Sequence, residues 1–123
     1  MRAVIFDIDG TLADVSHRVH HLDGEKDWPA FFGDMQDDPP IEAVAMLARL
    51  LHKAVEAGHG LDAVLIVTAR PARADWRQTT VDWLDLHGIA YDRIYFRAGG
   101  DMRPDQQVKA GILQRILDDR YEP

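Results

Sequence analysis

The sequence contains no cysteine. Disulfide bonds, thiolate metal sites and thiol nucleophiles are therefore excluded, and nothing in the composition opposes a reducing cytoplasmic location, which we expect. Basic residues are also few, with 14 lysines and arginines against 21 acidic residues and a net charge of −7. This charge argues against broad binding to duplex nucleic acid, although it leaves room for a small local basic site.

Long apolar runs, internal repeats, low-complexity tracts and a recognisable signal peptide are lacking as well. The 123 residues are enough for one domain with a hydrophobic core, and 46% hydrophobic residues are typical of a globular protein. We therefore expect a single domain over residues 1–123 and no membrane partner.

Three short apolar runs alternate with longer amphipathic segments. The runs 3–6, 63–67 and 94–96 predict buried parallel strands, whereas the amphipathic segments predict helices between Pro40 and Gly58, from Asp75 to His87 and from Gln106 to Asp119. This alternation is typical of an α/β fold with a parallel sheet and right-handed crossovers. Residues 13–40 form a polar insertion with several aromatic residues, which we expect to fold into a small cap over the site.

Polar residues follow each predicted strand at its carboxyl end. They are Asp7 and Asp9, then Thr68 and Arg70, then Arg97 and Arg103, with Lys109 near the start of the last helix. Because the carboxyl ends of parallel strands meet at one edge of a sheet, we expect these side chains to converge there.

Two carboxylates at close range repel each other unless they share a proton or a cation, and Mg²⁺ is the cation that best suits oxygen ligands. A carboxylate pair with a hydroxyl and a lysine predicts phosphoryl transfer through an aspartyl phosphate. Three histidines of the insertion lack the spacing of a metal site, and we expect them to be solvated; they are His17, His20 and His21.

Through Asp7-Ile8-Asp9-Gly10-Thr11, Thr68 and Lys109, the chain resembles the haloacid dehalogenase (HAD) superfamily of phosphotransferases. Within this superfamily it is most similar to the phosphatase domain of phage-type polynucleotide kinase-phosphatases. The segments that carry this resemblance are Val67-Thr68-Ala69-Arg70, Thr80 with Trp83-Leu84, Arg97 with Gly100-Asp101-Met102-Arg103-Pro104-Asp105, and Val108-Lys109.

The resemblance implies a three-layer, Rossmann-like HAD fold and a role for each matching residue. Asp7 would be the nucleophile and Asp9 the general acid and base, while Mg²⁺ would bind the Asp7 carboxylate and the Asp9 carbonyl. Thr68 would bind a phosphoryl oxygen and Lys109 would offset negative charge. The implied substrate contacts are Gly10, Thr11, Arg70, Arg97 and Arg103. The implied activity is a magnesium-dependent phosphatase that removes a 3'-phosphate from polynucleotide ends.

Two elements of the family pattern are not matched. The superfamily's last acidic pair follows a further strand, whereas here only Asp118-Asp119 at the end of a helix could supply it. We therefore expect a shortened sheet with the Asp7 strand at or near its edge, and self-association or partner binding at that edge. The motif GxxxxGK[ST] is absent, so we expect no kinase domain in this chain.

Three alternatives remain open at this stage. A phosphatase of free nucleotides or small metabolites would use the same residues. A non-catalytic binding module on a HAD scaffold would explain the unmatched acidic pair. A receiver-type signalling domain would need an acceptor aspartate after a middle strand, where this chain has Thr68-Ala69-Arg70.

Overall fold

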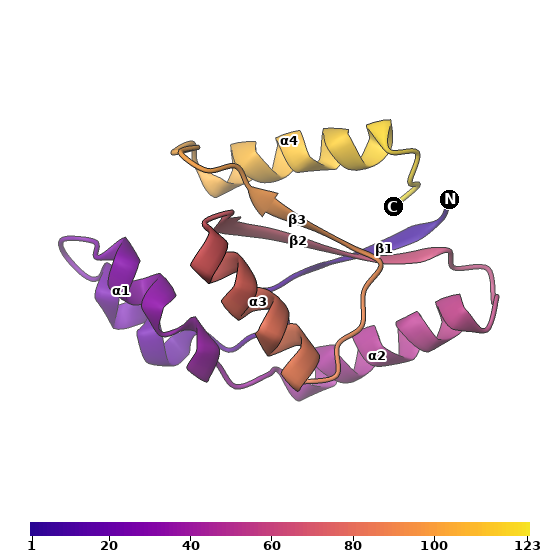
Figure 1. Cartoon of the computed structure of the whole chain (residues 1–123), viewed down its shortest axis with the longest axis horizontal. Coiled ribbons are helices and arrows are strands. Elements are labelled where there is room, and N and C mark those ends of the chain that lie inside the picture. Colours follow the sequence, from indigo (N-terminus) through magenta and orange to yellow (C-terminus); the bar gives the residue numbers. More distant parts are fainter.

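The computed structural model describes residues 1–123. It contains a three-stranded parallel sheet in the order β1-β2-β3, with β1 at Ala3–Asp7, β2 at Ala63–Pro71 and β3 at Arg93–Arg97. The connecting helices are α2 (Glu42–Glu56), α3 (Ala74–Leu86) and α4 (Asp105–Asp118). Helices α2 and α3 cover one face of the sheet and α4 covers the other (Figure 1). The predicted three-layer α/β fold is therefore confirmed.

The core explains why the strands are continuous apolar runs. Alternate side chains of β2 point to opposite faces of the sheet, so that Val64 and Ile66 pack with α2 and α3 whereas Leu65 and Val67 pack with α4. A strand covered by helices on both faces needs apolar side chains at every position. None of the helices has the length and apolarity needed to cross a membrane.

Strand β2 is longer than the sequence predicts. The apolar run ends at Val67, but the strand continues to Pro71 and pairs there with Arg97 of β3 after an irregularity in register. Asp7, the last residue of β1, lies opposite Val67. The extra residues therefore carry Thr68 and Arg70 past the end of β1 and toward the loop that follows it.

Strand β1 lies at the edge of the sheet, as expected. On its open side, β1 has a single parallel bridge, between Arg2 and Glu122. There the Glu122 carbonyl accepts a hydrogen bond from the N–H of Ala3, and the Glu122 N–H donates one to the carbonyl of Met1. Asp119 does not reach the carboxyl edge, because its carboxylate accepts from Arg93 and Tyr95 near the other end of the sheet. Self-association through the β1 edge stays a prediction.

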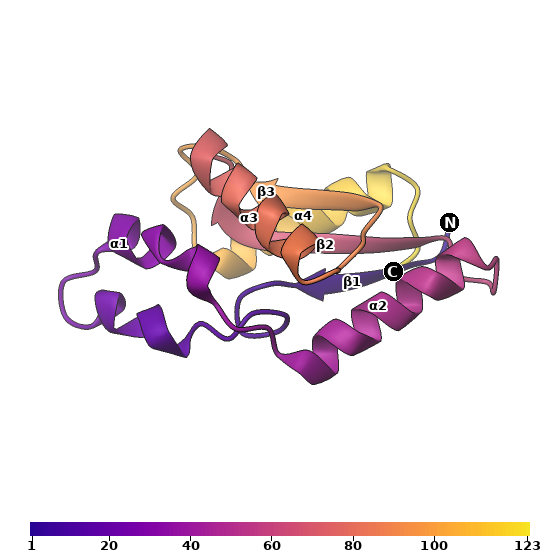
Figure 2. The ribbon, with the colours of Figure 1, turned by 60° about the horizontal axis from the view of Figure 1, so that its bottom comes forward.

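The insertion between β1 and α2 folds into the 3₁₀ helix η1 (Ser16–Leu22), the short helix α1 (Trp28–Gly33) and the 3₁₀ turn η2 (Met35–Asp37). Its two ends meet where Ala13 pairs with Pro40. A small cluster of Phe31, Phe32 and Met35 fills its interior and packs against Trp76 of α3. Figure 2 shows the insertion as a separate lobe beside α3. We refer to residues 13–40 as the cap.

Candidate active site

Asp7 and Lys109 form an ion pair at the carboxyl edge of the sheet. The Lys109 ammonium donates to Oδ2 of Asp7 over 2.7 Å, and the N–H of Ile8 donates to Oδ1 over 2.8 Å. Strand β1 and helix α4 thus bring together two residues that are 102 positions apart. Both side chains are about one-third exposed, with 32% for Asp7 and 37% for Lys109, so a ligand can reach them.

Asp9 follows on a turn at Gly10, which has a φ of +79°. That angle suits glycine, because a side chain would be strained there. Three N–H groups converge on Oδ1 of Asp9, from Arg18 over 2.9 Å and from Arg70 over 2.6 and 3.1 Å. Oδ2 of Asp9 receives no hydrogen bond from the protein, and the backbone carbonyl of Asp9 accepts none from the backbone. These two oxygens are free for a ligand.

Asp38, at the end of the cap, is a second acid in contact with the same two arginines. Its carboxylate accepts from Arg18 twice, over 2.8 Å each, and lies 3.4 Å from Arg70. His17 lies 2.6 Å from Oδ1, and the indole N–H of Trp83 donates to the Asp38 carbonyl over 2.8 Å. Asp38 is 3% exposed. We call Asp9, Asp38, Arg18 and Arg70 the acid–arginine cluster.

With both acids ionised, the formal charges within the acid–arginine cluster cancel, because two guanidinium groups face two carboxylates. Arg18 and Arg70 are 0% and 1% exposed, and burying such charges is tolerable only when they are paired and fully hydrogen-bonded. Every guanidinium nitrogen has a partner, since the third nitrogen of Arg18 donates to the Phe31 carbonyl and that of Arg70 to the Thr80 hydroxyl. The cluster joins the cap to β2 and α3 and holds Asp9 in one orientation.

Thr68 follows Val67, the residue of β2 that lies opposite Asp7, and is 1% exposed. Its hydroxyl oxygen accepts from the N–H of Arg70 over 3.1 Å, which leaves its own proton for another acceptor. Gly10 and Thr11 form the turn after Asp9, and their N–H groups donate to the carbonyls of Ala13 and Ile8. Among the hydrogen-bond donors of these two residues, only the Thr11 hydroxyl therefore has no partner within the chain.

The resemblance implies that Arg70 contacts the substrate, whereas in the structure all three of its guanidinium nitrogens donate to internal partners, namely Asp9, Asp38 and Thr80. This geometry favours a different role, namely positioning of Asp9. The difference arises because the extension of β2 turns Arg70 inward, where only internal partners are within reach.

Arg97 is the last residue of β3, and Arg103 lies in the loop that follows the strand. Arg97 donates to the carbonyls of Ala69, Asp101 and Arg103 and to the carboxylate of Asp105, so it ties β2 to the start of α4. Arg103 pairs with Asp101, and this contact lowers the pKa of Asp101 to about 2. Neither arginine touches the acid–arginine cluster; only Arg103, which is 56% exposed, is open to a ligand.

Arg18, Asp38 and Thr80 were missed as site residues by sequence analysis. Arg18 stands among histidines in a polar segment, and Asp38 lies in the acidic run before Pro39, so that neither carries a local sign of burial. Two of the three cap histidines bind acidic residues instead of being solvated, whereas His20 is exposed as expected. His17 binds Asp38, and His21 lies 2.7 Å from Asp34, where its hydrogen bond lowers the pKa of that carboxyl.

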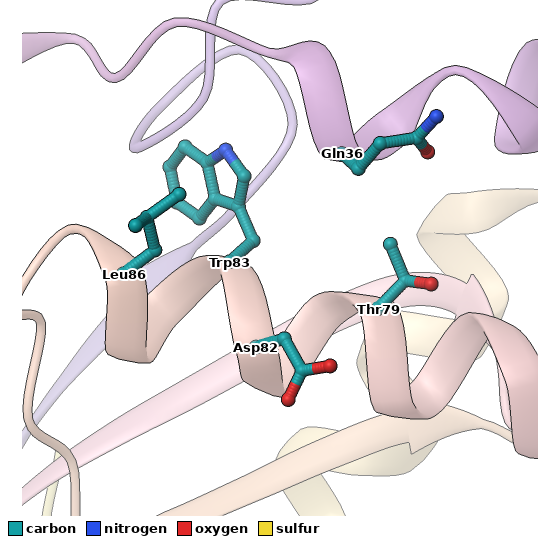
Figure 3. A pocket seen from close by; sticks show the side chains of 5 residues that line it. All are labelled: Gln36, Thr79, Asp82, Trp83 and Leu86. Carbon is teal, nitrogen blue, oxygen red and sulfur yellow. The ribbon is translucent and has the colours of Figure 1, made fainter.

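A cleft of about 290 Å³ opens beside the ion pair. It is lined by Asp7, Lys109 and four apolar side chains, Ile5, Val67, Leu113 and Ile116. A second hollow of about 190 Å³ lies between the cap and α3, lined by Gln36, Thr79, Asp82, Trp83 and Leu86 (Figure 3). Because no residue of the acid–arginine cluster and neither Asp7 nor Lys109 lines it, the second hollow is not part of this site.

The residues brought together are a carboxylate beside a lysine, a second oriented carboxylate and a buried hydroxyl. This set can attack a phosphorus atom, transfer a proton and stabilise phosphoryl oxygens. No group of three or more acidic, histidine or cysteine side chains is arranged to hold a metal ion by itself. Any divalent cation would therefore need backbone, water or substrate oxygens as well.

The chain matches the family model of the polynucleotide kinase PNKP phosphatase domain over residues 1–123. A search among curated proteins gives no match.

Two solved structures are similar in fold. One is a Pnkp1/Rnl/Hen1 complex, whose matching chain is 24% identical with a TM-score of 0.74 over 98% of this chain and 36% of that one. The other is a Pnkp1/Rnl/Hen1 RNA repair complex, at 24% identity and a TM-score of 0.68 over 93% of this chain and 31% of that one. The chain thus spans about a third of the length of the solved chains it resembles. Because the family model covers every residue, this chain belongs to the HAD-type phosphatase domain family of the polynucleotide kinase PNKP.

Proposed function

We propose that this domain is a magnesium-dependent phosphomonoesterase that forms an aspartyl phosphate on Asp7 and removes 3'-phosphates from polynucleotide ends. The observation that carries the proposal is the pairing of Asp7 with Lys109 at 2.7 Å, next to an Asp9 carboxylate held by two arginines. A structural ion pair alone would not need a second, separately oriented acid two residues further along the chain.

In the first step the Asp7 carboxylate attacks phosphorus, and the bond between phosphorus and the leaving oxygen breaks. Asp9 delivers a proton to that oxygen, so the departing group leaves as a neutral hydroxyl. We assign the proton to Oδ2 of Asp9, since Arg18 and Arg70 occupy Oδ1. Lys109 and the Thr68 hydroxyl offset the negative charge that spreads over the phosphoryl oxygens.

In the second step water attacks the phosphorus of the aspartyl phosphate. Asp9, which lost its proton in the first step, accepts a proton from that water. The bond between phosphorus and the Asp7 oxygen breaks, inorganic phosphate leaves, and Asp7 is a free carboxylate again. One acid thus serves as proton donor and then as proton acceptor, which requires that its orientation persist through both steps.

The oxygens present suit Mg²⁺, which prefers hard oxygen ligands and commonly keeps several waters. The Asp7 carboxylate and the Asp9 carbonyl, which accepts no backbone hydrogen bond, would hold the ion. When bound, it would supply positive charge next to the transferring phosphoryl group. The Asp9 side chain is not part of this ligand set, because the arginines hold it.

Family membership supports a phosphorylated nucleic acid end as the substrate. The similar structures are described as complexes of Pnkp1 with Rnl and Hen1, in one case as an RNA repair complex, which favours an RNA or DNA end over a small metabolite. A net charge of −7 means that recognition would be confined to the terminal phosphate and a few neighbouring groups. Arg103 and Thr11 are the available candidates.

The decisive experiment measures phosphate release with Mg²⁺ from three substrates: a 3'-phosphorylated oligonucleotide, its 5'-phosphorylated counterpart and a mononucleotide. We expect the 3'-phosphorylated oligonucleotide to be turned over fastest. A preference for the mononucleotide would instead indicate a phosphatase of free nucleotides. Binding without turnover of any substrate would indicate a non-catalytic module.

Asp7→Asn is the matching variant, and we expect it to abolish turnover because an amide is not a nucleophile here. Asp118→Asn is the control, since Asp118 binds only Gln114 on the surface of α4. Circular dichroism should show both variants folded. Retention of more than a few per cent of activity by Asp7→Asn would remove Asp7 from its role.

A further inference from the structure

The outer face of α2 carries an exposed apolar stripe. Ala43, Met46, Leu47, Leu50 and Ala54 are spaced as i, i+3, i+4, i+7 and i+11, which places them on one side of a helix. Met46, Leu47 and Leu50 are 56%, 49% and 57% exposed. Three large apolar side chains in a row are unusual for a free surface, where exposed hydrophobic residues are mostly scattered. We call these five residues the α2 stripe.

The α2 stripe is not the face that anchors the helix. Ala45 and Ala48 are fully buried on the opposite side, and Leu51 and Val55 pack with them against the sheet. Helix α2 is therefore apolar on two sides, and an apolar helix of this kind is normally covered on both. Figures 1 and 2 show no element of the chain lying over the outer side of α2. The stripe thus lacks a partner within the chain.

Charge along the border of the α2 stripe points to a particular partner. Glu42 begins the helix and Lys53 lies in its last turn, and both fall on the same border of the stripe, 20° apart at about 100° per residue. Glu42 pairs with Arg49 of its own helix over 3.4 Å but stays 65% exposed. When two copies of a helix pair in antiparallel fashion about a two-fold axis, equal borders face each other and opposite ends meet. Glu42 of one copy would then lie near the partner's Lys53, and the reverse, so both rim contacts would join opposite charges.

We propose that the α2 stripe is the interface of a homodimer in which the α2 helices of two copies pack antiparallel. Leu47 and Leu50, on either side of the middle of the stripe, would pack against their counterparts near the two-fold axis. This interface faces away from the sheet, so it leaves Asp7, Lys109 and the cleft beside them open.

The expected dimer is weak. A helix of 15 residues is about 22 Å long, and a single pair of such helices buries less than the roughly 1,200–2,000 Å² of a standard stable interface. The net charge of −7 on each copy also opposes association at low ionic strength. The dimer should therefore form only at high protein concentration, and it should form more readily at physiological salt than without salt.

Sedimentation velocity over a wide range of protein concentrations tests the interface. The wild-type chain should pass from monomer to dimer, and Leu50→Glu should raise the dissociation constant by at least about tenfold, because it buries a charge against an apolar partner. Leu117→Glu is the matched control, since Leu117 on α4 is 48% exposed and lies outside the stripe. A wild-type chain that stays monomeric throughout, or a dimer that survives Leu50→Glu, would overturn the proposal. The second result would also point to the β1 edge.

Charge exchange tests the antiparallel arrangement. Glu42→Lys and Lys53→Glu should each weaken the dimer, because each places two like charges at both rim contacts. An equimolar mixture of the two variants should associate again, since every rim contact in the mixed dimer then joins a lysine to a glutamate. Failure of the mixture to associate more strongly than either variant alone would exclude this arrangement. Phosphatase activity is not needed as a readout, so the result is independent of the proposed function.

Discussion

Asp38→Asn is the sharpest test of the acid–arginine cluster. The substitution keeps the size of the side chain but removes one of the two negative charges that face Arg18 and Arg70. Both guanidinium groups stay buried, and Asp9 alone must then balance them. The amide also places an N–H₂ group where a carboxylate oxygen now accepts hydrogen bonds from Arg18.

The expected loss follows from burial. Removing one partner from a buried ion pair costs about 3–5 kcal/mol, because the other charge is left without compensation. Domains of this size unfold with about 5–15 kcal/mol in total. The variant should therefore lose a large part of its stability, and its melting temperature should fall by roughly 10–20 °C.

Urea denaturation followed by tryptophan fluorescence gives the free energy of unfolding directly. The matched control is Asp75→Asn, because the Arg73–Asp75 pair is 60% and 57% exposed and pairs of this kind contribute at most about 1 kcal/mol. A loss of less than about 1 kcal/mol in Asp38→Asn would refute the view that this cluster holds the cap to the sheet.

Three further outcomes are expected. Asp9→Asn should lower turnover by about 10²–10⁴-fold, with a smaller loss for an aryl phosphate whose leaving group needs no proton; equal losses would exclude the acid role. Arg70→Lys should lower turnover by roughly 10²-fold, because an ammonium cannot bind both Asp9 and Thr80 as the guanidinium does. Unchanged kinetics would show that turnover does not need the guanidinium of Arg70. Burial, with a hydrogen bond to Asp119, raises the pKa of Tyr95 from 10.0 to about 12. Its contribution to stability should be complete below pH 10 and lost as the pH rises through about 12, and Tyr95→Phe should lack this step in a pH series of denaturation curves.

The sequence alone determined the order and type of the main elements. Residues 3–6 and 63–67 are apolar runs too short for a helix, and such runs are typical of parallel strands covered on both faces. The amphipathic segments between them indicated the helices. That topology also placed Asp7, Thr68 and Lys109 at one edge, since parallel strands end together. The structure joins Asp7 to Lys109 for this reason.

Only the tertiary structure decided which charged residues are buried and with which partners. Arg18 and Asp38 belong to a polar segment without periodicity, and their burial depends on the cap folding back onto the end of β2. Arg70 turned inward because the strand continues past its apolar run. The sequence does not tell whether an arginine binds a phosphate or an internal carboxylate, because its partner depends on which groups the fold brings within about 3 Å of the guanidinium.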